Sequence, residues 1–511
     1  MPKRSSGCFE CRQRKVRCDE ARPECNTCVR RGTKCPGYRP TQSFILHTFT
    51  EESERPGIIR EDENRYRYSN LSQSPEGLSR GGAAVRLHPA HARPVDAPVP
   101  RQVSPIAIDR VQHLGNFLQL YLPMREAEML TPPSALLLSL AATPASRNVF
   151  VASLDALSAA QLAVSDKTNV LINRSRSLYG TALSQLMKAI SEPERAVENE
   201  TLLATYLLTL YEVFVGVTAG HGFFFHVQGL LHLLQQRGPA SFGHSRLDMQ
   251  LFHGIRYNSL SIGYNFRKGS MLDSPEWLAV TAKAAKIDPY VSLLDICICI
   301  PRILERTDKL AQPSADPAAD IERLIDDAKQ LAGRAFEWIA HFSRDGPRYS
   351  KVDASSIDGF LDKCSDPELF NPVFAFKSFG TANMYCIYWM SMLILQSNTF
   401  GLLRRFRALE PKQLMLWDRE LAGYADSICR GVPYSCRPAA GYVGRFGTFT
   451  PLIVARKYFE AKKAEREIKW CEAVFYGNRV PGLYSPPIEI KGVKIPGLRA
   501  QQGVTVAEGG K

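Results

Sequence analysis

Six cysteines fall within the first 35 residues, and their regular spacing constrains the fold of this region more than any other feature of the chain. The unit C-x2-C-x6-C occurs twice; the six residues are Cys8, Cys11, Cys18, Cys25, Cys28 and Cys35. Tetrahedral zinc takes four ligands, and no histidine lies in this stretch. Six thiolates therefore complete two zinc sites only if two of them bridge both metals. The repeat predicts a binuclear cluster of two Zn²⁺ ions, with Cys8 and Cys25, the leading cysteine of each half, as the bridges.

A disulfide scaffold is the alternative interpretation of closely spaced cysteines, and it requires an oxidising compartment. Residues 1–4 lead directly into the cysteines without the apolar stretch of a signal peptide. The other seven cysteines are scattered through the remaining chain, as expected of a reduced protein. We therefore favour metal binding over disulfides.

Positive charge is concentrated around the same cysteines. Residues 1–40 hold 11 Lys and Arg against 4 Asp and Glu, a net +7 out of +13 for all 511 residues. Four of the six positions between Cys11 and Cys18 are basic. Two zinc ions with six thiolates carry only −2, so most of this charge is left over. A compact basic module of this kind is typical of nucleic-acid binding, with an affinity that falls steeply with salt.

Residues 7–38 resemble the fungal-type Zn(2)-C6 binuclear zinc cluster of transcription regulators, in the cysteine spacing, the basic stretch and Pro23 in the loop before the fourth cysteine. The resemblance implies a short helix after the second cysteine that presents its end to the major groove, where a lysine reads a CGG triplet. By position, Lys15 is the expected base-reading residue, with Arg14 beside it. The expected phosphate contacts, which position the module without reading sequence, are Arg12, Arg17, Arg30, Arg31 and Lys34.

The next segment, residues 41–108, is rich in proline and glycine, and its charges alternate without an apolar face. Such a composition predicts a disordered linker. No sustained heptads follow Cys35, so no coiled-coil dimer is evident. A homodimer formed through the large domain stays open.

Helical periodicity dominates the rest of the chain. Leu178, Ala182, Leu186, Met187 and Ile190 recur at spacings of three and four, which predicts one buried face of a helix. Residues 202–213 are apolar nearly all round, which is typical of a buried helix, and residues 379–406 are expected to form another. The apolar run of the second segment stops near Leu395 and is too short to span a membrane. Alternation typical of a strand is scarce until residues 486–496, where a short extended segment is expected.

The stretch 203–238 resembles the central region of the fungal-specific transcription factor domain. The matching positions are Glu212, His226, Gly229, Leu233, Leu234, Arg237 and Gly238. The sequence thus predicts a mainly α fold: a small N-terminal binuclear zinc cluster module over 1–40, a disordered linker over 41–108, a large all-α helical regulatory domain over 109–490 and a loose tail over 491–511.

No catalytic motif occurs in the sequence, so we expect no enzyme. Five histidines gather between His221 and His253, but no pair has the i, i+4 spacing of helical metal ligands. His226 is expected in a packing motif with Gly229 and Arg237, and Cys297 and Cys299 as core thiols. A cavity for a small effector would suit such a helical domain, but no convergent polar set in the sequence locates one.

The combined expectation is a nuclear, sequence-specific regulator of RNA polymerase II genes. It would bind double-stranded DNA and co-regulators or the transcription machinery, and no membrane; a metabolic or secondary-metabolite gene cluster is a candidate target. The alternative is a helical enzyme or ligand-sensing domain fused to a DNA anchor.

Overall fold

The computed structural model describes residues 8–19, 21, 25–33, 35, 105–123, 131–140, 148–166, 169–215, 221–313, 315–480, 486, 488 and 492–495. The chain divides into two compact units, Met1–Pro98 and Val99–Lys511. The first unit contains helices α1 (Phe9–Gln13) and α2 (Asn26–Val29). Most of the predicted linker, residues 41–104, lies outside the described residues. Its last four residues, 105–108, lie in a helix instead, since α3 begins at Pro105, where the fixed φ of proline suits a first helical position.

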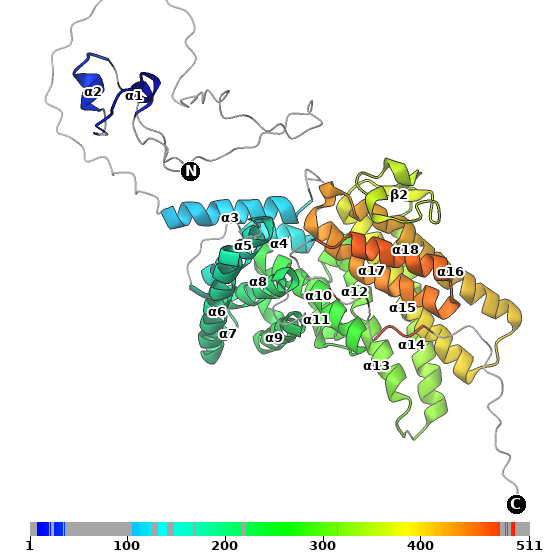
Figure 1. Ribbon diagram of the computed structural model, residues 1–511. Coiled ribbons are helices and arrows are strands. Elements are labelled where there is room, and N and C mark those ends of the chain that lie inside the picture. The colour runs from blue at the N-terminus through cyan, green and yellow to red at the C-terminus, as the bar shows by residue number, and fades with distance from the viewer. Residues whose placement is uncertain are drawn as a thin grey trace, which may run out of the picture. The chain divides into compact units, whose positions relative to one another are not determined.

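The second unit is built of helices, as predicted, and Figure 1 shows their arrangement. They are α3 (Pro105–Tyr121), α4 (Pro132–Leu140), α5 (Asn148–Asp166), α6 (Asn169–Ser191), α7 (Pro193–Ala196), α8 (Asn199–Val215), α9 (His221–Arg237), α10 (Arg246–Phe266), α11 (Pro275–Thr281), α12 (Pro289–Cys297), α13 (Ile300–Lys309), α14 (Pro317–Phe342), α15 (Phe379–Phe406), α16 (Pro411–Ser435), α17 (Gly441–Lys462) and α18 (Glu465–Gly477). The short 3₁₀ turns are η1 (Pro239–Ser241), η2 (Met271–Asp273), η3 (Ala284–Lys286), η4 (Ala354–Ser356), η5 (Leu361–Lys363) and η6 (Pro438–Ala440).

A two-stranded antiparallel hairpin is the one β feature among the described residues. Strands β1 (Tyr349–Val352) and β2 (Val373–Phe376) pair with Tyr349 opposite Phe376. The sequence did not predict this hairpin. The extended segment expected at 486–496 is not a strand at any of the positions that the structure describes there, namely 486, 488 and 492–495.

Two groups of helices share one continuous apolar core. In the first group α5 packs against α3, α6 and α8, and α8 packs against α9; in the second, α15 packs against α14, α16 and α17. Helix α10 contacts α4, α8, α9 and α12, and α12 contacts α15, so these two helices connect the groups. Helix α15 spans the predicted 379–406, and nearly all of residues 379–403 are buried. The prediction of a buried helix there is confirmed.

Helix α6 corrects one predicted face. Ala182 and Leu186 are buried, but Met187 is 69% exposed and Ile190 is 44% exposed. The buried positions near them are Ser175, Tyr179 and Ala189. Together with Ala182 and Leu186, these residues still follow spacings of three and four, so α6 does bury one face. The observed face differs from the predicted one because Ser175, Tyr179 and Ala189, which are small or carry a hydroxyl, are buried in place of Met187 and Ile190.

Arg267 fixes the end of α10 to elements far apart in sequence. It adopts a left-handed conformation with φ 52° and is 6% exposed. Its guanidinium donates to Asp308 Oδ2 at 2.7 Å and to Asn398 Oδ1 at 2.9 Å. A buried arginine with several acceptors ties α10 to α13 and α15, because leaving these groups unpaired inside the protein would be costly.

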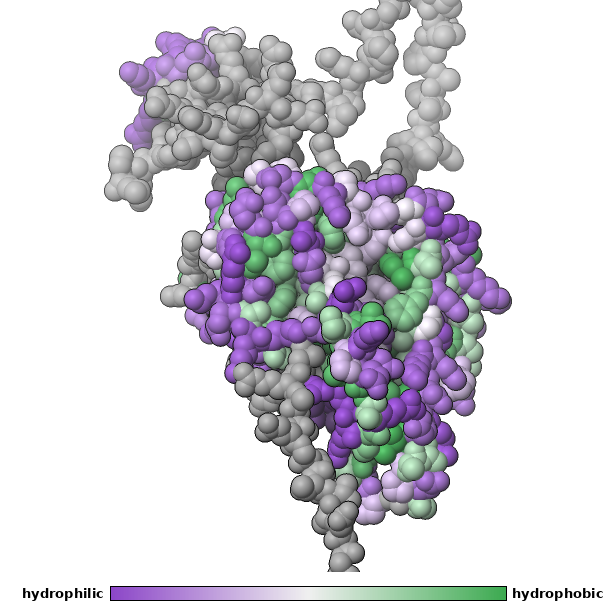
Figure 2. Space-filling model, turned by 90° about the vertical axis from the view of Figure 1, so that its right-hand side faces the viewer, coloured by the Kyte–Doolittle hydropathy of each residue, from purple (hydrophilic) through white to green (hydrophobic). Residues whose placement is uncertain are grey.

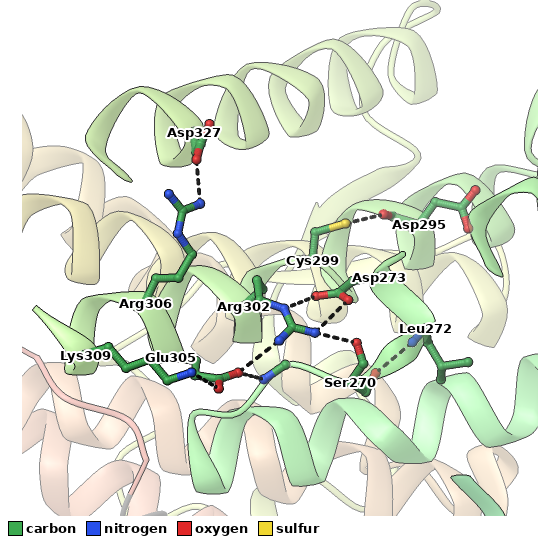
Figure 3. Close-up of polar contacts among 11 residues, drawn as sticks. Ser270, Leu272, Asp273, Asp295, Cys299, Arg302, Glu305, Arg306, Lys309 and Asp327 are labelled. Carbon is green, nitrogen blue, oxygen red and sulfur yellow. Dashed lines mark hydrogen bonds and ion pairs between the residues drawn. The ribbon is translucent and has the colours of Figure 1, made fainter. Parts of the chain in front are cut away.

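A second charged network holds the loop after α10 against α13 (Figure 3). Arg302 donates to both carboxylate oxygens of Asp273, at 2.9 and 3.0 Å, and to the Ser270 carbonyl at 2.9 Å. Glu305 accepts from the backbone N–H of Gly269 at 2.9 Å and forms an ion pair with Lys309 at 2.8 Å. The charged groups of this network pair with one another, so the network stabilises the packing of the loop against α13.

The predicted packing role of Cys297 and Cys299 agrees with their positions. Cys297 is 1% exposed in the core, and the half-buried Cys299 donates to the Asp295 carbonyl at 3.3 Å. Burial raises the pKa of Cys297 to about 12, so this thiol stays protonated at neutral pH.

His226 belongs to a buried polar cluster between α6, α8 and α9. The Tyr179 hydroxyl donates to Glu212 Oε1 at 2.6 Å and lies 3.0 Å from His226 Nε2. Glu212 is fully buried, and a Cβ at Gly222 would lie only 2.3 Å from the Glu212 carboxyl carbon. Gly222 is therefore required by close approach. Burial lowers the pKa of His226, and the charge of Glu212 opposes that shift.

His253, on α10, is expected to make the stability of the helical unit sensitive to acid. It is 5% exposed beside Arg256, which pairs with Asp295, and its Nδ1 has no hydrogen-bond partner in the part of the chain that the structure describes. Burial, and then the Arg256 charge, lower its pKa from 6.5 to about 3. The unfolded chain thus takes up this proton at a higher pH than the folded chain. The contribution of neutral His253 to the free energy of unfolding is therefore present above about pH 6.5 and is lost as the pH falls below that value. The free energy of unfolding should drop by about 1.4 kcal/mol between about pH 7.5 and 5.5.

Urea unfolding of wild type and His253→Gln at these two pH values measures this contribution. Tryptophan fluorescence reports the helical unit alone, because all five tryptophans lie in it. The variant should lose less stability on acidification than the wild type, whereas His232→Gln, at an exposed position, should behave as wild type. Equal acid sensitivity in wild type and His253→Gln would contradict the assignment.

The surface of the helical unit is mixed in character. Figure 2 shows hydrophilic residues interspersed with smaller groups of apolar ones on one face. None of the helices that the structure describes has the length and hydrophobicity needed to cross a membrane.

Candidate metal centre and DNA-facing residues

The two halves of the cysteine repeat fold in the same way. Helix α1 starts directly after Cys8, and α2 starts directly after Cys25. The backbone N–H of Cys11 donates to Cys8 Sγ at 3.4 Å, and the N–H of Cys28 donates to Cys25 Sγ at 3.3 Å. In each half the leading cysteine thus caps the first turn of its helix, which is why a two-residue spacing brings the second thiol to the same side.

The six thiols form two overlapping groups of four. One group comprises Cys8, Cys25, Cys28 and Cys35, the other Cys8, Cys11, Cys18 and Cys25, and within each group all sulfur atoms lie within 4.8 Å of one another. Cys8 Sγ is 3.6 Å from Cys25 Sγ and 3.7 Å from Cys28 Sγ, and Cys11 Sγ is 3.7 Å from Cys25 Sγ. Zn–S bonds of about 2.3 Å in a tetrahedron place neighbouring sulfurs about 3.8 Å apart.

The donor set therefore fits zinc and does not fit disulfides. A disulfide would need sulfurs about 2.05 Å apart, and all 13 cysteines carry reduced thiols. Cys8 and Cys25 are the two members common to both groups, which are the residues that the repeat singles out. Burial, and then the contact with Cys8, raise the pKa of Cys11 to about 12. A cation is what holds such closely packed sulfurs as thiolates at neutral pH.

Lys15 lies at the C-terminal end of α1 in an unusual backbone conformation. Its φ is 54°, in the left-handed region, and its side chain is exposed. Gly32, seventeen residues later, occupies the same place after α2 with φ 66°. Both turns close with equivalent bonds, from Val16 N to Cys11 O at 3.0 Å and from Thr33 N to Cys28 O at 3.1 Å. Glycine is the residue this conformation favours, so the local fold gives no reason for a lysine here.

The structure shows the exposure of four of the other residues that are expected to contact DNA. Arg14, Arg17, Arg30 and Arg31 are exposed, and Arg14 lies 3.9 Å from Glu10 on the same helix. The side chain of Arg12 lies outside the described residues, as do Lys34 and Pro23. Val16, directly after the left-handed residue Lys15, is 40% exposed.

Asp19 is a positioning residue that the sequence did not identify. Its carboxylate accepts from the backbone N–H of Asn26 at 3.1 Å and of Thr27 at 3.4 Å, at the start of α2. Desolvation opposes the effect, but the hydrogen bonds with Asn26 and Thr27 lower the pKa of Asp19. Asp19 thus joins the two halves of the module. An acidic residue directly after the third cysteine, facing a helix N-terminus, was the available signal.

Comparison with known families agrees with this geometry. Residues 6–43 match the fungal Zn(2)-Cys(6) binuclear cluster domain, and residues 114–297 match the fungal specific transcription factor domain. No significant match to a solved structure was found.

Short stretches are similar to curated fungal proteins. Over 35 residues the chain is 54% identical to the aspercryptin biosynthesis cluster-specific transcription regulator of Emericella nidulans, covering 7% of this chain and 6% of the relative. Over 54 residues it is 41% identical to a Zn(2)-C6 fungal-type transcription factor of Aspergillus fumigatus, covering 11% and 14%. Over 76 residues it is 33% identical to the adhesion and hyphal regulator 1 of Candida albicans, covering 14% and 12%. The matches thus span a small part of each relative.

Proposed function

Because the chain carries a fungal Zn(2)-Cys(6) binuclear cluster domain followed by a fungal specific transcription factor domain, we propose that it is a sequence-specific DNA-binding regulator of transcription by RNA polymerase II. The observation that carries this proposal is the pair of overlapping thiol groups with an exposed lysine at the end of α1. The protein acts in the nucleus, without catalysis of its own. The helical unit serves as its regulatory and interaction surface.

In this proposal two zinc ions hold the module together. Cys11 and Cys18 complete one site and Cys28 and Cys35 the other, with Cys8 and Cys25 shared. Zinc supplies the folding energy of a segment whose two short helices could not form alone, since isolated helices this short are unstable in water.

Lys15 is the proposed reader of a CGG triplet, with Arg14 beside it. Its exposed ammonium can donate to the O6 and N7 acceptors that guanine presents in the major groove. The proposed phosphate contacts are Arg12, Arg17, Arg30, Arg31 and Lys34. They would supply the salt-dependent part of the affinity without sequence information.

The proposal extends to the class of genes that the protein regulates. One relative is named as the regulator of a biosynthesis cluster, and this supports a metabolic or secondary-metabolite gene cluster as the target here. The domain limits stay as proposed from sequence, except that the helical unit begins by Pro105.

Selection of bound duplexes from a randomised DNA pool by the full-length, zinc-loaded protein tests the proposal. We expect recovery of sequences that contain CGG, and loss of this enrichment after zinc is removed with a chelator. A pool that stays random with the zinc-loaded protein, or an enrichment that survives zinc removal, would contradict it.

A further inference from the structure

The helical unit contains a partly open cavity that the proposed DNA-binding function does not use. The cavity has a volume of about 290 Å³ and is lined by residues of α4, α8, α9, α10, α15 and α17, together with Tyr121, Tyr290, Thr131 and Pro486. An apolar cavity of about 150 Å³ is large enough to bind benzene. This cavity is about twice that size, enough for one molecule of about two fused rings.

The lining is aromatic and uncharged. Of the 24 described residues that line the cavity, nine are Phe or Tyr and none is Asp, Glu, Lys, Arg or His. Burial raises the pKa of Tyr257 to about 12 and also raises the pKa values of Tyr206 and Tyr290. Their phenols are therefore neutral at physiological pH. An ion would lose its hydration here and gain no partner of opposite charge among these residues.

Two polar residues of the lining have atoms that lie inside the wall of the cavity and not at its surface. Asn258 is 8% exposed and Tyr290 is 3% exposed, and Asn258 Nδ2 and the Tyr290 hydroxyl are fully buried without a hydrogen-bond partner among the described residues. A ligand in the cavity therefore does not reach these two atoms, and its binding rests on the apolar and aromatic lining.

We propose that this cavity binds a neutral, largely aromatic small molecule. Rings of the ligand would contact the aromatic lining of the cavity. The site lies within the helical unit, so the proposal goes beyond DNA recognition and does not depend on it. It agrees with the idea of a helical domain that senses a ligand.

Gly447, in the middle of α17, allows the cavity to be filled without disturbing its walls. It lines the cavity, and a Cβ placed there meets no heavy atom of the described residues within 4 Å outside its own stretch of helix. The side chain of Gly447→Leu would therefore occupy the cavity, while the loss of a mid-helix glycine favours the helix. Gly423→Leu, on an exposed position of α16 with the same open surroundings, is the matched control away from the cavity.

The test measures binding of coumarin, a neutral bicyclic molecule with a carbonyl acceptor, and of the charged coumarin-3-carboxylate. Isothermal titration calorimetry uses the full-length, zinc-loaded protein. We expect coumarin to bind at one site, and the carboxylate to bind at least about tenfold more weakly. Gly447→Leu should abolish binding and Gly423→Leu should retain it.

Two results would overturn the proposal. One is that the folded wild type binds no coumarin, which would mean that the cavity holds water and does not bind a ligand of this class. The other is that Gly447→Leu binds as wild type does, which would place the ligand elsewhere. Neither result bears on zinc content or on DNA selection, so failure of this site and failure of the proposed DNA function can be told apart.

Discussion

Replacement of Cys11 by serine should abolish sequence-specific DNA binding and leave residues 8–35 without a stable fold. Cys11 is 2% exposed, and its sulfur lies in one of the two thiol groups. A serine hydroxyl is a much weaker zinc ligand than a thiolate. Structural zinc contributes about 10–16 kcal/mol to small zinc modules, far more than the apolar packing available here.

Zinc stoichiometry measured by native mass spectrometry, together with DNA binding of the full-length protein, checks this result. Cys8→Ser should lose both metal ions, because Cys8 belongs to both groups, whereas Cys11→Ser should affect one site more directly. Cys299→Ser, a thiol of the helical unit, is the control and should keep zinc and DNA binding. Retention of specific binding by Cys11→Ser would show that the thiol groups do not form the metal centre.

Replacement of Lys15 by glycine should separate folding from recognition. Lys15 has φ 54°, and a non-glycine residue pays about 1–2 kcal/mol for this conformation. Gly32 holds the equivalent position in the second half at no such cost. Lys15→Gly should therefore keep the zinc content and leave the module at least as stable. Discrimination for CGG should fall by about 1–3 kcal/mol, or roughly 5- to 150-fold.

Competition binding with CGG-containing and scrambled duplexes measures that loss. Arg31→Ala is the matched control, because a phosphate contact should weaken both duplexes alike and keep their ratio. Unchanged discrimination in Lys15→Gly would remove Lys15 as the reader. Discrimination lost equally in Arg31→Ala would mean that the basic residues act only as a group.

The parts of the fold that the sequence predicted are those governed by regular spacing. The cysteine repeat places six thiols at fixed offsets, and the structure gathers their sulfurs into two groups that share Cys8 and Cys25. The segment 379–406, whose apolar run stops near Leu395, forms α15, because a helix that is hydrophobic on all sides must be buried. These features depend on local pattern alone.

The parts that could not be predicted depend on long-range contact or on local backbone geometry. Strands β1 and β2 are short, and they are separated by twenty residues, so nothing in the alternation of either segment identifies their pairing. The buried face of α6 depends on which helix packs against it, and Met187 was therefore misplaced. Lys15 was chosen by resemblance, and its left-handed conformation became visible only in the fold.

The cavity is a further feature that could not be predicted from the sequence, because it depends on how the helices pack. Asn258, Tyr290 and Gly447 lie far apart in sequence, and no motif connects them. They meet because α10 and α17 approach the start of α12 within one core. A site of this kind has no signature in a single sequence, since each residue is ordinary in its own segment.

Genome-wide occupancy of the full-length protein in its own cells, compared with that of Lys15→Gly expressed at the same level, tests the central claim most directly. The claim predicts focal occupancy over promoters that contain CGG triplets, and loss of those peaks in the variant with nuclear protein unchanged. The positions of the wild-type peaks would also identify the regulated genes. Peaks that are equally sharp in Lys15→Gly, or wild-type occupancy without CGG enrichment, would contradict the assignment of target selection to the zinc module.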